Sequence, residues 1–229
     1  MKHQITLALA TLAFLAGCAA TPQMPISLTA DTVAEKSGRI GVAMTPLPKV
    51  DTYFPGAGCL LCLATASLAN SSLTTYTQKL AYEDLPQLKV QIADALRKKG
   101  ADVVIIDEDI KLDAFPNASS KGPNVSKKDF SSLRGKYKVD RLLLISIGVL
   151  GVERTYSAYI PTSDPKVVLR GTGYLVNLSS QAYEWYQPVN VQKSSDGPWN
   201  EPPKFPGLTN AYFQAIELGK DAFMQPFAR

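Results

Sequence analysis

An amphipathic segment and two continuous apolar runs form the clearest pattern in the chain. Between residues 83 and 99, apolar side chains recur at positions 85, 88, 92 and 96, which predicts a helix with one apolar face. Asp84 is placed to cap this helix. The apolar runs 103–106 and 141–148 are typical of strands buried on both faces, so we expect 103–106 to be a central strand.

The remaining pattern completes an α/β fold. Residues 39–45 predict a first strand, and residues 126–136 predict a short helix capped by Ser126. Strand, helix, strand, short helix, strand is the order of a parallel βαβαβ core. Alternating residues later in the chain predict antiparallel strands, and a C-terminal helix follows; these segments are 155–160, 166–178, 181–189 and 209–224. We therefore expect one α/β domain over residues 38–229, with a mixed sheet.

Two glycines interrupt the pattern inside the predicted strand 166–178. Gly171 and Gly173 occupy positions where a strand normally carries side chains. A glycine in a strand interior often marks a bulge or the close approach of another group. A phosphate-binding loop would need a helix directly after the strand, and none follows here. We expect a bulge or a close backbone approach at these positions.

The first eighteen residues have the layout of a secretory signal. Lys2 precedes an apolar run from Ile5 to Leu15, and the segment ends in Leu-Ala-Gly-Cys18. The run has about half of the roughly 20 residues that a membrane-spanning helix needs. Its last four residues resemble the lipobox of bacterial lipoproteins, in which the signal is cut before the cysteine and the thiol is acylated.

The lipobox resemblance implies a location for the mature chain. Residues 1–17 would be the signal peptide, and Cys18 would carry the acyl groups, palmitate among them, that anchor the protein in a bilayer. An Asp after the lipidated cysteine retains enterobacterial lipoproteins in the inner membrane, whereas Ala19 follows here. This implies the outer membrane, facing the periplasm. Residues 18–37 predict a tether, and a short strand at 26–28 is the alternative.

Composition narrows the classes of function. Cleavage would remove Lys2 and the single histidine, His3, leaving 23 basic and 20 acidic residues, a net charge of +3. No imidazole would then serve a nucleophile or ligate a metal. The small basic surplus does not indicate nucleic-acid binding. We therefore expect no enzyme activity, no cofactor, no metal and no nucleic-acid partner.

The segment 56–69 is apolar on every side, and no charged residue lies between Asp51 and Lys79. One interpretation is a helix or hairpin packed on the core of the domain. The other is an exposed patch that docks on a partner subunit or enters the bilayer surface. For the second interpretation, the candidate contact residues are Leu60, Leu61, Leu63 and Leu68.

Two further groups of residues have open interpretations. Cys59 and Cys62 could form a disulfide, remain buried thiols or act as a redox pair, although leucines rather than cations surround them. Two cysteines without histidine are a poor metal site. Tyr183 and Trp185 could offer an aromatic surface to a partner or a membrane, whereas alternation on a half-buried strand favours the core.

The order of elements and one pair of strands resemble small Gram-negative envelope lipoproteins. In that group a strand of the pattern Val-x-Leu-x-Leu-Val-Asp turns and returns with Glu-x-Trp, as residues 167–185 nearly do. Residues 138–145 and 88–106 are similar to its other strand and its helix-strand unit. The group includes the N-terminal domain of TolB, activators of penicillin-binding proteins and the curli secretion lipoprotein. Asn177 replaces the usual acid, and the segment 56–69 is absent from the pattern.

This resemblance implies a non-catalytic accessory, assembly or adaptor subunit of an envelope complex, with envelope proteins as partners. The alternative is an oligomeric, membrane-inserting protein of the secretion type, in which copies of the chain associate. A third hypothesis is a periplasmic thiol-disulfide protein that uses Cys59 and Cys62.

Overall fold

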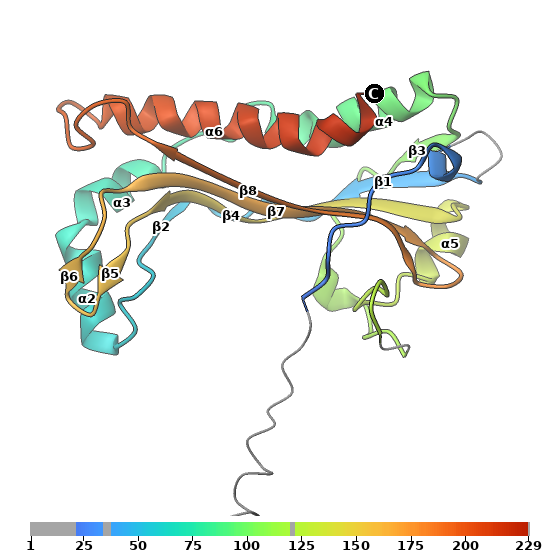
Figure 1. Ribbon diagram of the computed structural model, residues 1–229, viewed down its shortest axis with the longest axis horizontal. Coiled ribbons are helices and arrows are strands. Elements are labelled where there is room, and N and C mark those ends of the chain that lie inside the picture. Colours follow the sequence, from blue (N-terminus) through green and yellow to red (C-terminus); the bar gives the residue numbers. More distant parts are fainter. Residues whose placement is uncertain (1–21, 34–37, 120–121, 229) are drawn as a thin grey trace, which may run out of the picture.

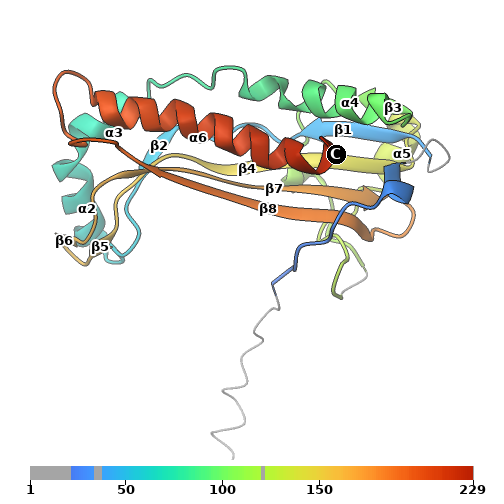
Figure 2. The same cartoon turned by 45° about the horizontal axis from the view of Figure 1, so that its top comes forward.

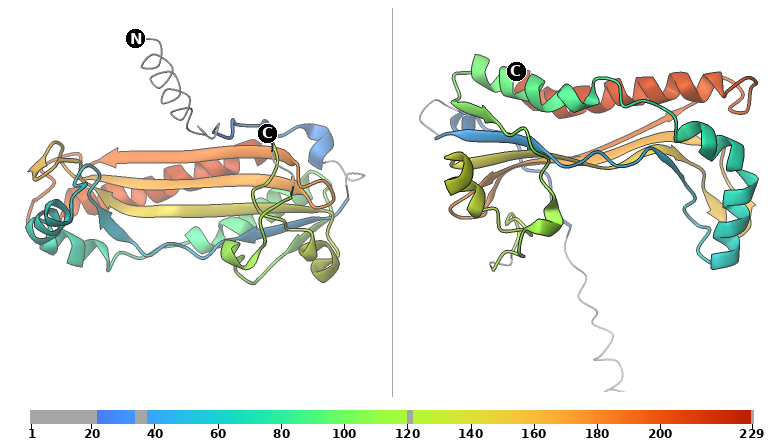
Figure 3. Two further views of the ribbon diagram at one scale, coloured as in Figure 1. Left: turned by 90° about the horizontal axis from the view of Figure 1, so that it is seen from below. Right: turned by 180° about the vertical axis from the view of Figure 1, so that it is seen from behind.

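The computed structural model describes residues 22–33, 38–119 and 122–228. One long sheet runs through the molecule, and helices α4 (Leu88–Lys98) and α6 (Pro206–Met224) lie along one of its faces (Figures 1 and 2). The middle of the opposite face is not covered by any helix of the described residues (Figure 3). The signal segment and Cys18 lie outside the described residues.

The sheet is mixed, as predicted. Its strands follow the order β3-β1-β4-β7-β8, and β2 pairs with the far end of β4. β1 is parallel to β3 and β4, whereas β4, β7 and β8 are antiparallel neighbours. The strands are β1 (Ile40–Met44), β2 (Asp51–Tyr53), β3 (Val103–Ile105), β4 (Arg141–Glu153), β7 (Lys166–Asn177) and β8 (Tyr183–Ser194).

The remaining elements are short. A small hairpin joins β5 (Tyr156–Ser157) to β6 (Ile160–Pro161), and it replaces the longer strand predicted at 155–160. Ala158 has φ 53°, a conformation that turns the chain and ends the strand. The other helices are α2 (Leu60–Ala69), α3 (Ser71–Thr77), α5 (Ser132–Tyr137) and the 3₁₀ turns Ala30–Val33, Leu85–Gln87, Leu112–Ala114 and Gln225–Phe227.

The core is divided by the sheet into two clusters. The larger cluster lies under α4 and α6 and includes Ile92, Trp185 and Tyr212. The smaller cluster lies on the other face, where Phe130 and Leu133 pack inward as predicted. The prediction that 103–106 forms a central strand is wrong, because β3 is an edge strand in this order. Its apolar run reflects coverage of both faces, which an edge strand also has here.

Neither of the two predicted cap residues makes a capping bond. Asp84 occupies the N-cap position of the 3₁₀ turn Leu85–Gln87, but its carboxylate pairs with Lys220 of α6 instead. The Ser126 hydroxyl accepts the backbone N–H of Lys128, and α5 begins only at residue 132. At Asp84 a tertiary ion pair replaces the capping bond, and at Ser126 a local turn does.

The N-terminal described segment is held against the body. Ile26 and Tyr186 exchange two backbone hydrogen bonds of 2.8 and 3.1 Å across the edge of β8. Val33 is buried in the larger cluster. Residues 22–33 therefore contact the body, and the short pairing at Ile26 agrees with the alternative to the predicted tether. Among the described residues, no helix has the length and apolarity that crossing a membrane requires.

Candidate interaction surface

Helix α2 is formed by the apolar segment 56–69 and begins at a disulfide. Cys59 occupies the N-cap position and bonds covalently to Cys62. The Cys59 sulfur also accepts the backbone N–H of Cys62 at 3.0 Å. The first turn of α2 is thereby closed by a covalent staple and a capping contact.

A buried asparagine joins α2 to α3 and fastens them to the body. The Asn70 side-chain amide donates to the Ala66 carbonyl at 2.8 Å and to the Tyr156 hydroxyl at 2.7 Å. Arg154 donates to the Asn70 side-chain oxygen at 3.0 Å. The same guanidinium lies 5.0 Å above the ring of Trp199. This network fixes the angle at which α2 leaves the sheet.

The inner side of α2 is made of small residues. Cys62 and Ala66 face inward and pack with Tyr156 in a cluster separate from the two large ones. Phe54 meets the Tyr156 ring edge-on, with centroids 5.9 Å apart. Gly56 has φ 88°, and a Cβ there would lie 1.8 Å from the Tyr156 carbonyl oxygen. The backbone at Gly56 therefore packs directly against the backbone at Tyr156, and small side chains are enough on the inner side of α2.

The large side chains of α2 point outward. Leu60, Leu61 and Leu68 are 85%, 69% and 76% exposed, and Leu63 is also exposed. Tyr159 and Ile160 of the β5–β6 hairpin add to this exposed apolar surface, beside α2 in Figures 1 and 2. We call these six residues the apolar tip. Of the two interpretations of segment 56–69, the exposed patch is the one that the structure supports.

The disulfide fits a structural role better than a redox role. Cys59 is exposed at a helix start, a position that lowers the pKa of many reactive thiols. However, no charged side chain occurs between Asp51 and Lys79, so the segment supplies no cation to stabilise a thiolate. Tyr159 is the polar neighbour of the Cys59 sulfur, with its hydroxyl 3.7 Å away. The bond closes the first turn of the helix that carries the leucines.

The aromatic residues of β8 do not form an open platform. Trp185 is 1% exposed and packs edge-on against Phe227, so the interpretation of Trp185 as a contact residue is corrected. Tyr183 is half-buried, and it packs with Tyr174 and Tyr186 over the smaller core cluster. Burial raises the pKa of Tyr183 above its ordinary value. These rings serve packing on both faces of the sheet.

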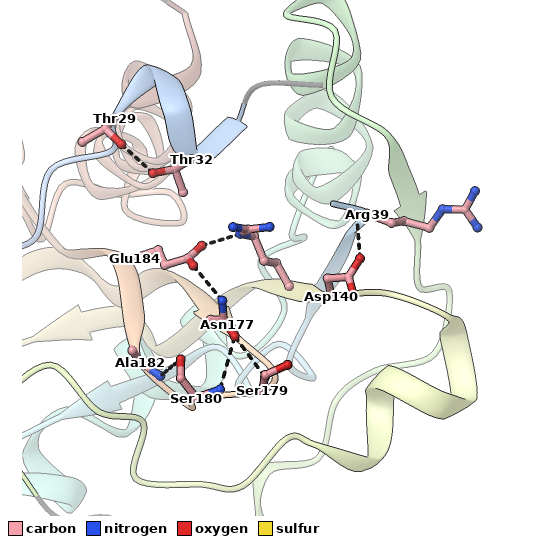
Figure 4. Close-up of polar contacts among 10 residues, drawn as sticks. Thr29, Thr32, Arg39, Asp140, Asn177, Ser179, Ser180, Ala182 and Glu184 are labelled. Carbon is pink, nitrogen blue, oxygen red and sulfur yellow. Dashed lines mark hydrogen bonds and ion pairs between the residues drawn. The ribbon is translucent and has the colours of Figure 1, made fainter. Parts of the chain in front are cut away.

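Charged and amide side chains at the β7–β8 turn hold strands together (Figure 4). Glu184 accepts from Arg141 at 2.5 Å and from the Asn177 amide at 3.0 Å. The Asn177 oxygen accepts the backbone N–H groups of Ser179 and Ser180, which fixes the turn. Asp140 accepts the backbone N–H of Arg39 at 3.1 Å. Asn177 thus has a structural use for the amide that replaces the usual acid.

A groove of about 760 Å³ separates α2 and α3 from the sheet. Arg170 and Glu153 form an ion pair of 2.6 Å in its wall, so their charges neutralise each other. Thr52 and Thr74 also line the groove and hydrogen-bond to each other. Phe54, Val149 and Leu63 of the apolar tip also line the groove, which therefore combines paired polar groups with apolar side chains.

Sequence reasoning missed the residues that position the tip. Asn70 and Arg154 lie 84 positions apart and meet only in the folded chain. The alternating pattern of residues 155–160 predicts that Tyr159 and Ile160 belong to a longer strand. The pair Ala158-Tyr159 at a sharp turn gives no distinctive sequence signal. The exposure of these residues is decided by where the hairpin sits beside α2.

The fold and this surface define a mixed α/β protein with an exposed apolar tip. No protein-family model and no curated protein sequence matches the chain. The chain is similar to several solved structures at low identity, and three of them are as follows. A PelC dodecamer from Paraburkholderia phytofirmans has 10% identity and a TM-score of 0.33, covering 90% of this chain and 95% of that one.

Protein XCC0632 from Xanthomonas campestris has 12% identity and a TM-score of 0.37, covering 92% of this chain and 89% of that one. Lipoprotein GNA1162 from Neisseria meningitidis has 14% identity and a TM-score of 0.31, covering 79% of this chain and 94% of that one. Likeness at these TM-scores carries no argument about this chain.

Proposed function

We propose that this chain is an accessory protein of the bacterial cell envelope that acts by surface contact. In this proposal, acylated Cys18 holds the protein at the periplasmic face of the outer membrane. The observation that carries the proposal is the apolar tip, because exposed and contiguous apolar side chains usually mark a contact site. The Leu-Ala-Gly-Cys18 sequence supports the anchor.

The use of charged residues supports contact over catalysis. Arg141 pairs with Glu184, Arg170 with Glu153, and Lys220 with Asp84, and each pair joins two elements of the fold. A general acid or base needs a proton-transfer partner at the substrate, whereas these groups are directed at each other. They contribute to holding the strands and α6 in place.

The open edge of β8 is the expected place for a protein partner. Within the described part of the chain, Ile26 pairs with the outer side of this strand at Tyr186, and the Tyr183 N–H donates to the Asn124 carbonyl. Asn190 and Gln192 follow on the same strand and are exposed. An unpaired edge offers backbone donors and acceptors to an added strand. Pro188 lacks an N–H, so pairing would begin beyond it.

Fractionation and mass spectrometry test the anchor. We expect the native protein to begin at Cys18, to carry acyl chains and to sediment with the outer membrane. The Cys18→Ser variant should be recovered in the periplasmic extract with an intact fold. Retention of residues 1–17, or a lipid-free wild-type protein in the cytosol, would contradict the proposal.

Photo-crosslinking in intact cells tests the contact. A photoreactive amino acid at Gln192 on the open edge should give a discrete adduct with an envelope protein. The same group at Lys98, exposed on α4, is the matched control and should give none. An adduct between two copies of the chain would instead support the oligomeric alternative, and equal labelling at both positions would remove the edge as the contact site.

A further inference from the structure

We infer that the apolar tip enters the headgroup layer of the same bilayer that holds Cys18, so that the protein meets the membrane at two separated points. This inference rests on the proposed acyl anchor. It assigns the tip to a phospholipid surface rather than to a protein. Four observations about the described residues support it.

The length of the connection to the anchor is the first observation. Gln23 is fixed to Asn124 by two hydrogen bonds, of 2.9 and 3.0 Å, and Ile26 is fixed to Tyr186. Only four residue steps separate Cys18 from Pro22, and a fully extended chain of that length spans about 14 Å. The body cannot move far from the bilayer, and the side on which the described chain begins must face it.

The position of the tip is the second observation. Helix α2 and the start of the described chain lie on the same side of the sheet, opposite α4 and α6, whereas Leu28 and Val33 pack on the other side (Figures 1 and 3). The start of the described chain and the tip therefore face the same surface. They lie apart along the length of the sheet, so an anchor near the first and a lipid contact at the second would fix the orientation of the body (Figure 1).

The chemistry of the tip is the third observation. No charged residue lies between Asp51 and Lys79, so α2 and α3 can approach lipid without losing the hydration of a charge. Leucines on an interfacial helix enter the boundary between headgroups and acyl chains to a depth of about 5–10 Å. Tyr159 has an apolar ring and a polar hydroxyl, a combination that is enriched at membrane interfaces.

The size of the tip is the fourth observation. It exposes six large apolar side chains, whereas a stable protein interface engages about 20–30 residues on each partner. A second copy bound through the tip alone would bury too little surface. A bilayer sets no such minimum, because it accepts each apolar side chain that reaches it. The disulfide and the hydrogen bonds of Asn70 stabilise α2 before it meets lipid. Insertion into the headgroup layer therefore does not require α2 to fold first.

Tryptophan fluorescence on vesicles tests the inference. The acylated mature protein is placed in vesicles of phosphatidylethanolamine and phosphatidylglycerol in equal parts, with or without brominated acyl chains. Leu61→Trp reports on the tip, and Leu218→Trp, also exposed but on α6, is the matched control. We expect brominated lipid to remove about half of the added emission at position 61 and none at position 218.

A second variant separates lipid contact from misfolding. Adding Leu60→Asp to Leu61→Trp should abolish the quenching, while circular dichroism and the acyl anchor remain unchanged. Unquenched emission at position 61 in an acylated, vesicle-bound protein would overturn the inference and leave the proposed function intact. A dimer by native mass in which position 61 is shielded would assign the tip to a second copy. An absent acyl group would instead contradict the proposed function.

Discussion

Two glycines of β7 show how tightly single positions are specified. A Cβ on Gly173 would lie 2.4 Å from the ring of Trp185, and one on Gly171 would lie 2.6 Å from the Ser146 carbonyl oxygen. A register shift between Ile147 and Val149 lies across from Gly171. The expected close backbone approach is therefore confirmed at Gly171, whereas the irregularity lies in β4, at Gly148, and Gly173 makes room for a side chain. The core tolerates a tryptophan at position 185 because its neighbour has no side chain.

Replacing Gly173 tests this packing. We expect Gly173→Ala to lower the free energy of unfolding by about 1–3 kcal/mol, because the buried Trp185 ring must shift. Gly135→Ala in α5 is the control, since a Cβ there meets no atom within 4 Å. That change should raise stability by about 0.5–1 kcal/mol. Urea denaturation measures both, and equal effects at the two sites would contradict the steric argument.

The ion pair between Lys220 and Asp84 makes the free energy of unfolding depend on pH in the acidic range. The Lys220 ammonium lies 2.6 and 2.7 Å from the two Asp84 oxygens, and its hydrogen bond holds the pKa of Asp84 below its usual value. Folding therefore favours the carboxylate. The stability gained is present above the unfolded pKa, about 3.9, and is lost as pH falls through the lowered folded pKa.

We expect Asp84→Asn to be less stable than wild type at neutral pH. Between about pH 5 and pH 2, its free energy of unfolding should fall by less than that of wild type. Chemical denaturation across that range is the measurement. Asp109→Asn, at an exposed loop position, should follow the wild-type profile. Parallel curves for wild type and Asp84→Asn would show that this pair does not couple folding to protons.

At the scale of elements, α2 reverses the usual arrangement of an amphipathic helix. Small residues face the body, and leucines face outward. Its contacts belong to a small cluster with Tyr156 that is separate from the two large core clusters. The Cys59–Cys62 bond closes a loop within this one element. The tip is therefore a unit that can loosen without opening the sheet.

Reduction of the disulfide tests this independence. The loop it closes is far shorter than the 15 residues for which cross-linking contributes about 3 kcal/mol, so we expect only a local effect. Hydrogen exchange of residues 59–69 should become faster on reduction, while β4 and α6 keep their protection. Loss of protection across β4 and α6 would instead make the tip part of the global folding unit.

At the scale of the whole molecule, one long sheet connects all parts. β4 pairs with β1 near its start and with β2 near its end. This single strand therefore runs from the parallel strands at one end of the sheet to the end that carries the tip. Helices α4 and α6 cover one face, where Leu28 and Val33 also pack, and leave the other for α2 and the start of the described chain (Figure 2). The orientation on a membrane that we infer is a property of this arrangement rather than of any single residue.

Much of the fold could be predicted from local patterns. The spacing of Leu88, Ile92 and Leu96 gives α4 its buried face, and the apolar run from Arg141 to Gly148 gives the first part of β4. The order of strands and helices predicted the parallel core and the antiparallel strands that follow. β2 was missed, since three half-buried residues carry no periodic signal. The candidate site was partly predicted, because four of its six residues were named.

The sequence by itself determined the mixed α/β fold, the apolar and charge-free character of segment 56–69, and the pair Cys59 and Cys62. These follow from residue type and spacing, which act over a few positions. Only the tertiary structure decided that β3 is an edge strand, that Trp185 is buried and that the leucines of α2 are exposed. The reason is that burial depends on what packs against a residue, and those neighbours come from distant parts of the chain, as Asn70 and Arg154 do.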